Sequence, residues 1–281
     1  MLAAGLITFR EGLEAALIVG IVLGYLKKIG RLDRQGYLWV GVVAASLVSL
    51  GVALGLQAIG GQFTGRAEEI FEGTTMFLAV GVLTWMIFWM RYQGRYIKVA
   101  LERDVQVAVT EGENWALFGL AFIAVLREGV ETALFLSAAA FVSASANTLF
   151  GGLLGLGVAL LVGYLIFATT VRLDVRRFFD VTSVLLLLFA AGLLAHGVHE
   201  FQEAGLIPVI VEHLWDINHV LNEKSTLGSI LKALLGYNGN PSLLEVSSYL
   251  GYWAVVLSSV SWWIKRVGLR LPPQTDSASH S

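Results

Sequence analysis

Two short segments carry the same charged residues at the same spacing. Residues 10–17 and 127–134 share the pattern R-E-G-x-E-x-A-L. On a helix, the two glutamates of each segment lie on one face, and the arginine lies one turn before the second glutamate on that face. If the two faces meet, the carboxylates and guanidinium groups converge with a net formal charge of −2. Carboxylate oxygens suit hard cations, so the pattern predicts a metal site at Glu11, Glu14, Glu128 and Glu131, with Arg10 and Arg127 beside it.

These charges stand in an apolar chain. Of its 281 residues, 56% are hydrophobic and only 14% are charged, whereas a soluble protein carries about 25% charged residues. The composition excludes an ordinary soluble enzyme, a nucleic-acid binder and a disordered protein. The chain has no cysteine, which excludes disulfides, thiolate metal sites and a cysteine nucleophile. Any metal must therefore be held by oxygen or imidazole.

Seven segments are long and apolar enough to cross a membrane, which takes about 20 residues each. They predict an all-α integral membrane protein with one permease domain over 1–271, followed by a polar, disordered cytoplasmic tail over 272–281. The predicted spans are 2–26, 37–59, 70–90, 115–141, 149–170, 180–200 and 246–264.

The charged pattern falls in the first and the fourth span, which suggests that spans one to three are repeated as spans four to six. A fainter likeness links Phe71-Glu72, opening the third span, with Phe179-Asp180, opening the sixth. The second copy of the motif comes three spans after the first, and because three is odd, the two halves cross the membrane in opposite directions. Transporters with such inverted repeats have their site between the repeats near the midplane. Gly12 and Gly129 would permit close helix approach or local unwinding. The predicted order is repeat one at 1–92, repeat two at 115–204, an external loop at 205–245 with an amphipathic helix, and a seventh helix at 246–264.

Basic residues outside the spans predict the orientation, since they favour the cytoplasmic side. One side has only Arg66, Lys224 and Lys232. The other has Lys27, Lys28, Arg31, Arg34, Arg91, Arg95, Lys98, Arg103, Arg172, Arg176, Arg177, Lys265, Arg266 and Arg270. We therefore expect a multi-pass protein of the cytoplasmic membrane with its N-terminus outside and its C-terminus in the cytoplasm.

The buried charges favour a functional site over a purely structural ion-pair network. An ionised side chain at the centre of a membrane helix costs about 2.5–3.5 kcal/mol on insertion scales, so six cost on the order of 15–20 kcal/mol before pairing. Two arginines can neutralise only two of the four glutamates. The remaining carboxylates need a cation or a proton.

A second polar cluster is predicted where the sixth span reaches the outer face. His196, His199, Glu200 and Glu203 share one helix face, and Glu72 at the start of the third span could line the same vestibule. Imidazole with carboxylate suits iron and other transition metals, so this is a candidate outer recruiting site. Asp180, at the other end of the sixth span, is a candidate inner exit. Tryptophans near span ends, Trp85 and Trp89 among them, are interpreted as headgroup anchors.

The paired R-E-G-x-E motifs on the first and fourth of seven spans resemble the oxidase-dependent iron permease family, which includes fungal high-affinity iron transporters and bacterial ferrous-iron permeases. The resemblance covers nearly the whole chain, including residues 198–205 and 235–241. It implies that Glu11, Glu14, Glu128 and Glu131 bind iron and that iron moves into the cytoplasm. It also implies that a ferroxidase or other extracytoplasmic iron-handling protein is a separate partner.

Iron, as Fe²⁺ or Fe³⁺, is then the transported substrate, and we expect no tightly bound cofactor, no enzyme activity and no nucleic-acid partner. The alternatives are a permease for another divalent metal (Mn²⁺, Zn²⁺ or Pb²⁺), a metal sensor without flux, and a membrane di-iron oxidase. An oxidase would use Glu-x-x-His pairs, and the central motifs are Glu-x-x-Glu. G-x-x-x-G spacings at Gly51/Gly55 and Gly151/Gly155 favour tight packing within the bundle and leave homo-oligomers open.

The predicted orientation can be tested by labelling, because the chain lacks cysteine. A single cysteine at Ser225 should react with an impermeant maleimide added outside cells, whereas one at Ser277 should react only after permeabilisation. The reverse pattern would invert the topology and place the proposed vestibule in the cytoplasm.

Overall fold

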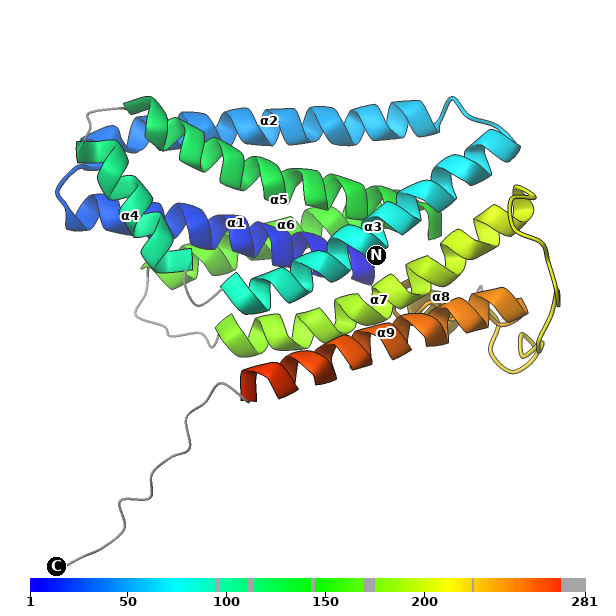
Figure 1. The fold of residues 1–281 in the computed structure, drawn as a ribbon. Helices are drawn as coiled ribbons and strands as arrows, with labels where there is room; N and C mark the ends of the chain where they lie inside the picture. The colour runs from blue at the N-terminus through cyan, green and yellow to red at the C-terminus, as the bar shows by residue number, and fades with distance from the viewer. Residues whose placement is uncertain (94–96, 111–113, 143–144, 169–174, 224, 269–281) are drawn as a thin grey trace, which may run out of the picture.

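The computed structural model describes residues 1–93, 97–110, 114–142, 145–168, 175–223 and 225–268, and these residues are helical with no β-strand. Figure 1 shows the long helices side by side in one bundle, with short helices α4 and α8 toward opposite ends. In chain order the helices are α1 (Leu2–Lys28), η1 (Leu32–Arg34, a 3-10 turn), α2 (Gln35–Gly60), α3 (Arg66–Gln93), α4 (Ile97–Thr110), α5 (Asn114–Val142), α6 (Ser145–Ala168), α7 (Val175–Glu203), α8 (Thr226–Leu235) and α9 (Leu243–Gly268). The predicted tail over 272–281 lies outside the described residues.

Five stretches of the described chain are long and apolar enough to cross a membrane, namely Leu32–Gly60, Arg66–Met90, Ala146–Ile166, Arg177–Glu203 and Leu243–Trp262. They confirm an all-helical integral membrane protein. Helices α1 and α5 have 27 and 29 residues, so they too are long enough to cross. The charged motif lies in the middle of each, however, and α1 and α5 remain predicted spans.

The two motif helices are each backed by a helix with small residues at the contact. Helix α1 packs against α6, and α5 packs against α2. A Cβ atom added at Gly12 would lie 2.9 Å from the Cβ of Ala159, and one at Gly129 would overlap the Ser49 side chain. Both motif helices continue through their glycine without a break. The glycines therefore serve close approach rather than local unwinding.

The same kind of contact recurs along both pairs of helices. A Cβ atom added at Gly155 of α6 would overlap the backbone of Gly5 in α1, and one at Gly41 of α2 would lie 2.6 Å from the carbonyl oxygen of Phe118 in α5. By contrast, Gly51 has open space around it. Gly155 therefore packs tightly within the bundle, as predicted, and Gly51 does not.

A hydrophobic core joins α3 and α7 with the ends of α1 and α5. Its members include fully buried Ile7, Leu83, Phe135, Leu186 and Leu193. Helix α9 packs on α7, and the hydroxyl groups of Tyr252 in α9 and Thr84 in α3 are hydrogen-bonded at 2.8 Å. The core therefore fixes the end of α1 that precedes its motif and the end of α5 that follows its motif.

Helix α8 is the amphipathic helix predicted within 205–245. Ser225 caps it, its Oγ accepting a hydrogen bond from the Gly228 backbone N–H at 3.0 Å. It ends at Gly236, which has φ +68° and lies against Gly192 in the middle of α7. Helix α8 also packs on α1 and α5, and Leu234 rests on the hydrophobic core. It thus covers one end of the bundle instead of lying apart from it.

Helix α4 was not expected, because the sequence between the third and fourth spans reads as a charged loop. Val105 and Ala108 are buried against Leu26 of α1, Leu38 of α2 and Leu117 of α5. Two apolar residues three positions apart form one helix face, so packing across neighbouring helices gives this charge-rich segment a helical conformation.

Candidate metal site

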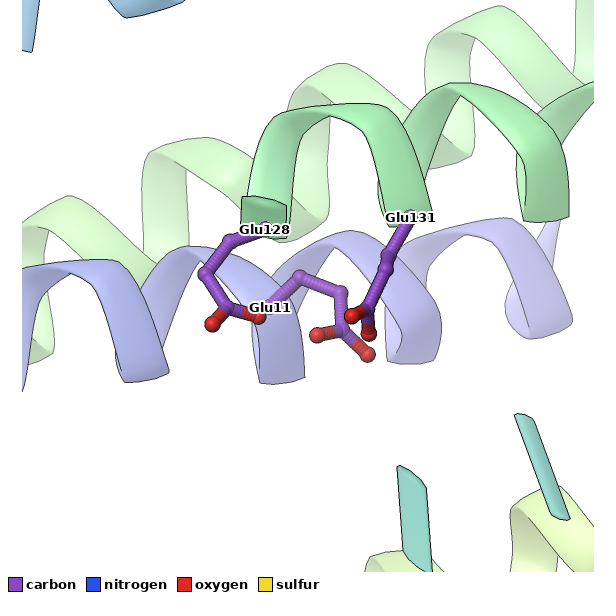
Figure 2. Close-up of side chains that lie close together, drawn as sticks. All are labelled: Glu11, Glu128 and Glu131. Atoms are coloured by element: carbon purple, nitrogen blue, oxygen red, sulfur yellow. The ribbon is translucent and has the colours of Figure 1, made fainter. Parts of the chain in front are cut away.

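Three of the four motif glutamates converge between α1 and α5. These helices are in contact and run in opposite directions. Each of Glu11, Glu128 and Glu131 offers a carboxylate oxygen within 4.8 Å of the others, and all three residues are buried. Figure 2 shows the Glu11 carboxylate, from α1, between the two that descend from α5. Among the described residues, no other group of three or more metal-ligating side chains is close enough to hold one ion.

Glu14 is buried one turn along α1, but it lies outside this group. Its Oε1 is 3.2 Å from Nε of Arg10, so its nearest charge is the arginine of its own motif. The predicted site of four ligands is therefore a group of three with Glu14 beside it. The i, i+4 spacing predicts this ion pair, but it cannot show that Glu14 lies outside the group while Glu131, which forms the same pair with Arg127, lies inside it.

Each arginine contacts both carboxylates of its own motif. Arg10, only 1% exposed, contacts Glu11 through NH1 at 3.4 Å and Glu14 through Nε at 3.2 Å. The ion pairs of Arg127 with Glu128 and Glu131 both involve Nε, at 3.4 and 3.1 Å. Its side chain is 35% exposed, so the two halves of the site are not equivalent.

The carboxylates retain unused coordination capacity. One oxygen each of Glu11, Glu128 and Glu131 is buried and has no hydrogen-bond partner, and the Glu11 and Glu128 carboxyl groups are within hydrogen-bond reach of each other. Two ionised carboxylates this close repel, so the pair favours a shared proton or a bound cation. Buried and unpaired acceptors that face one another are what a desolvated cation needs as ligands.

Apolar side chains cover the group on the side of α8. Ile7 lies one turn before Glu11, Phe135 lies one turn after Glu131, and both are fully buried. Leu234 of α8 rests on the same hydrophobic core. Buried apolar residues therefore flank both motifs toward the α8 end.

Beyond this layer, the candidate outer residues gather where α7 ends and α3 begins. His199 Nε2 lies 3.3 Å from Glu203 Oε1, and the rings of His196 and His199 have their centroids 6.1 Å apart. Glu72 lies close enough to Glu200 and Glu203 for their charges to interact. The predicted vestibule residues are thus neighbours, although within the described chain they do not form a compact group of three ligands. Asp180, exposed near the start of α7, lies at the opposite end of that helix.

Glu245 is an additional residue of this region that the sequence reading missed. It is buried, and it accepts hydrogen bonds from Asn238 Nδ2 at 2.7 Å and from the Ser242 N–H at 3.1 Å, and it lies 3.1 Å from His199 Nδ1. A carboxylate thus lies at each ring nitrogen of His199, so both nitrogens can donate when the imidazole is protonated. The signal was available, because Ser242 and Glu245 have the capping-box spacing before an apolar run.

Two residues of α3 were missed as neighbours of the motif arginines. The sequence alone suggests a headgroup anchor at Trp89, but its ring lies over the Arg127 guanidinium, with Cζ 4.4 Å from the centroid. Met90, the next residue, has its sulfur 3.1 Å from NH2 of Arg10. No pattern in the sequence signals these contacts, since they depend on where α3 crosses the other helices.

Comparison with known proteins decides the family. The model of the iron permease FTR1 family matches residues 1–271. The chain belongs to this iron permease family. The FTR1 match spans both motif helices and all the candidate residues described above.

Curated relatives agree with the family assignment. The chain is 41% identical to a protein of Yersinia pestis over 249 residues, covering 88% of each, and 37% identical to proteins of Shigella sonnei and Escherichia coli O157:H7 over 276 residues, covering 98% of this chain and 97% of theirs. All three are named "Ferrous iron permease EfeU". They are named as permeases and not as enzymes. No solved structure matches the chain.

The inequivalent arginines give a testable difference. Lysine keeps the charge but places it on one nitrogen, so Arg10→Lys cannot serve both Glu11 and Glu14, whereas Arg127→Lys replaces a single contacting nitrogen. We expect Arg10→Lys to lose most iron uptake and to lower the melting temperature in detergent, since a stranded buried carboxylate costs about 3–5 kcal/mol. Arg127→Lys should retain more uptake. Equal, wild-type behaviour of both variants would show that charge alone suffices.

Proposed function

We propose that this FTR1-family chain imports iron across the cytoplasmic membrane, with Glu11, Glu128 and Glu131 as ligands and Glu14 as a further carboxylate beside them. The observation that carries the proposal is the set of buried, unpaired carboxylate oxygens facing one another between α1 and α5. Family membership supports iron as the substrate. The ferrous iron permease relatives favour Fe²⁺.

In this proposal α1 and α5 cross the membrane as well, which gives seven spans in a three-plus-three inverted repeat plus α9. The packing supports the repeat, because α1 contacts α6 in the way that α5 contacts α2, and Gly12 and Gly129 hold equivalent places in these contacts. The antiparallel course of the motif helices is what inverted halves require. Repeat one then covers 1–92 and repeat two 115–204, within one domain over 1–271.

The proposed route enters beside α8 and leaves at the opposite end. His196, His199, Glu200, Glu203 and Glu72 recruit iron at the outer mouth, and Asp180 marks the inner exit. The bias of basic residues supports this direction, with the N-terminus outside. A separate ferroxidase or extracytoplasmic iron-handling protein would deliver the metal, and homo-oligomerisation stays open.

Iron would bind by replacing the proton held between the carboxylates. Leaving water is costly for a divalent ion, and the three buried carboxylates offset that cost with oxygen ligands and charge. Arg10 and Arg127 balance part of the charge, so the loaded site is close to neutral and iron can leave again. Oxygen ligands select poorly among divalent metals, which leaves Mn²⁺, Zn²⁺ and Pb²⁺ as alternative cargo. The permease names of the relatives disfavour the oxidase alternative.

Radio-iron uptake into proteoliposomes tests this function, with Fe²⁺ and Fe³⁺ supplied separately. Glu11→Gln, Glu128→Gln and Glu131→Gln should each reduce uptake to near background, because each removes a charged ligand and keeps the shape of the side chain. The control is Glu212→Gln, at an exposed position outside the bundle. Wild-type uptake by a Glu14→Gln, Glu131→Gln double variant would contradict the carboxylate site.

Loss of the recruiting site should change the half-saturation concentration for iron rather than the maximal rate. A site upstream of the central barrier raises the local iron concentration, so His199→Ala and Glu203→Gln should raise the half-saturation concentration and largely keep the maximal rate. His213→Ala, also in the external region but exposed, is the matched control. Unchanged curves would reduce these residues to solvated polar groups at a helix end, and a collapsed maximal rate would place them in the conduction path.

A further inference from the structure

The end of α3 contacts both halves of the proposed site through two consecutive residues. Trp89 lies against Arg127 of α5, and Met90 lies against Arg10 of α1. Consecutive residues of a helix point about 100° apart, so this turn of α3 reaches the motif helices on two sides. Helix α3 itself supplies no carboxylate to the central group. Its contribution there is to the arginines.

The Trp89 ring constrains how Arg127 can meet its carboxylates. Both ion pairs that join Arg127 to Glu128 and Glu131 use Nε, while the ring lies over the guanidinium carbon at 4.4 Å. An arginine free to turn prefers a bidentate pair, in which two nitrogens occupy both oxygens of one carboxylate. Here the second oxygens of Glu128 and Glu131 have no hydrogen-bond partner. They are therefore left for another ligand.

Met90 has a comparable place on the other side. Arg10 donates a hydrogen bond from NH1 to Glu11, its Nε lies at ion-pair distance from Glu14, and NH2 donates to the Met90 sulfur. The thioether is a weak acceptor, so it occupies this nitrogen without adding a charge. One oxygen of Glu11 likewise remains unpaired.

We propose that Trp89 is a positioning residue. It holds the Arg127 guanidinium so that Nε contacts the carboxylates, and it thereby keeps the unpaired oxygens of Glu128 and Glu131 free for iron. Met90 supports Arg10 on the other side. This inference rests on the proposed carboxylate site and adds the determinant of its affinity. Without the ring, Arg127 turns onto the carboxylates and competes with the metal. Iron binding weakens, but the ligands themselves stay.

A series of variants at Trp89 distinguishes the effect of the aromatic ring from the effect of side-chain size. Trp89→Phe keeps a ring for the cation, and Trp89→Leu keeps an apolar side chain without one. Iron uptake into proteoliposomes should show a half-saturation concentration raised about 3- to 10-fold in Trp89→Leu, the range expected for a lost cation–π contact. The maximal rate should stay within about twofold, and Trp89→Phe should remain close to wild type.

Trp39→Leu is the matched control, because it makes the same chemical change at an exposed position of α2. Size-exclusion profiles and melting temperatures in detergent verify that each variant is folded. Trp89→Leu should have no further effect on equilibrium Fe²⁺ binding in an Arg127→Lys background if it acts through this arginine.

Equal effects of Phe and Leu at Trp89, a loss confined to the maximal rate, or full additivity with Arg127→Lys would each overturn the positioning role. These results differ from a failure of the proposed function. If the wild-type protein neither binds nor transports iron, the carboxylate site is wrong whatever Trp89 does, and if it does both while Trp89→Leu matches it, only the positioning role is wrong.

Discussion

The structure depends on an excess of buried negative charge. Four carboxylates and two guanidinium groups lie between α1 and α5, and several of the carboxylate oxygens have no partner. In a membrane-embedded bundle water cannot offset this charge. A proton or a cation would offset this charge, and the surrounding helices keep the carboxylates close together. In the proposed function, that cation is iron.

Close backbone packing is what holds the charged helices in place. Gly12 sets the distance from α1 to α6, and Gly129 sets the distance from α5 to α2. Neither contact includes a charged group, so the ligand positions are fixed from behind by shape. This separates the two tasks of the motif, in which the glutamates face the site and the glycine between them faces the supporting helix.

The sequence predicts what depends on spacing along one helix. The duplicated motif places the carboxylates on one face of each helix, and Glu11, Glu128 and Glu131 do converge. It predicts the i, i+4 ion pair of Arg10 with Glu14, but it could not predict that Glu14 lies outside the group or that Trp89 stacks on Arg127, since these depend on side-chain choice and helix crossing. Similarly, α4 is helical because of contacts with three other helices, whereas its own sequence reads as a charged loop.

The apolar layer of Ile7 and Phe135 has an electrical consequence. A dry, weakly polarisable layer concentrates the transmembrane voltage, because the watery regions on either side conduct ions and sustain little field. On the proposed route, a cation moving from the α8 side to the carboxylates would cross a large part of the potential within this short distance. For a divalent ion the full drop is worth about 4.6 kcal/mol per 100 mV, from about 2.3 kcal/mol per elementary charge. In the orientation proposed above, with the α8 side outward and the cell interior negative, this voltage would favour movement of iron toward the carboxylates.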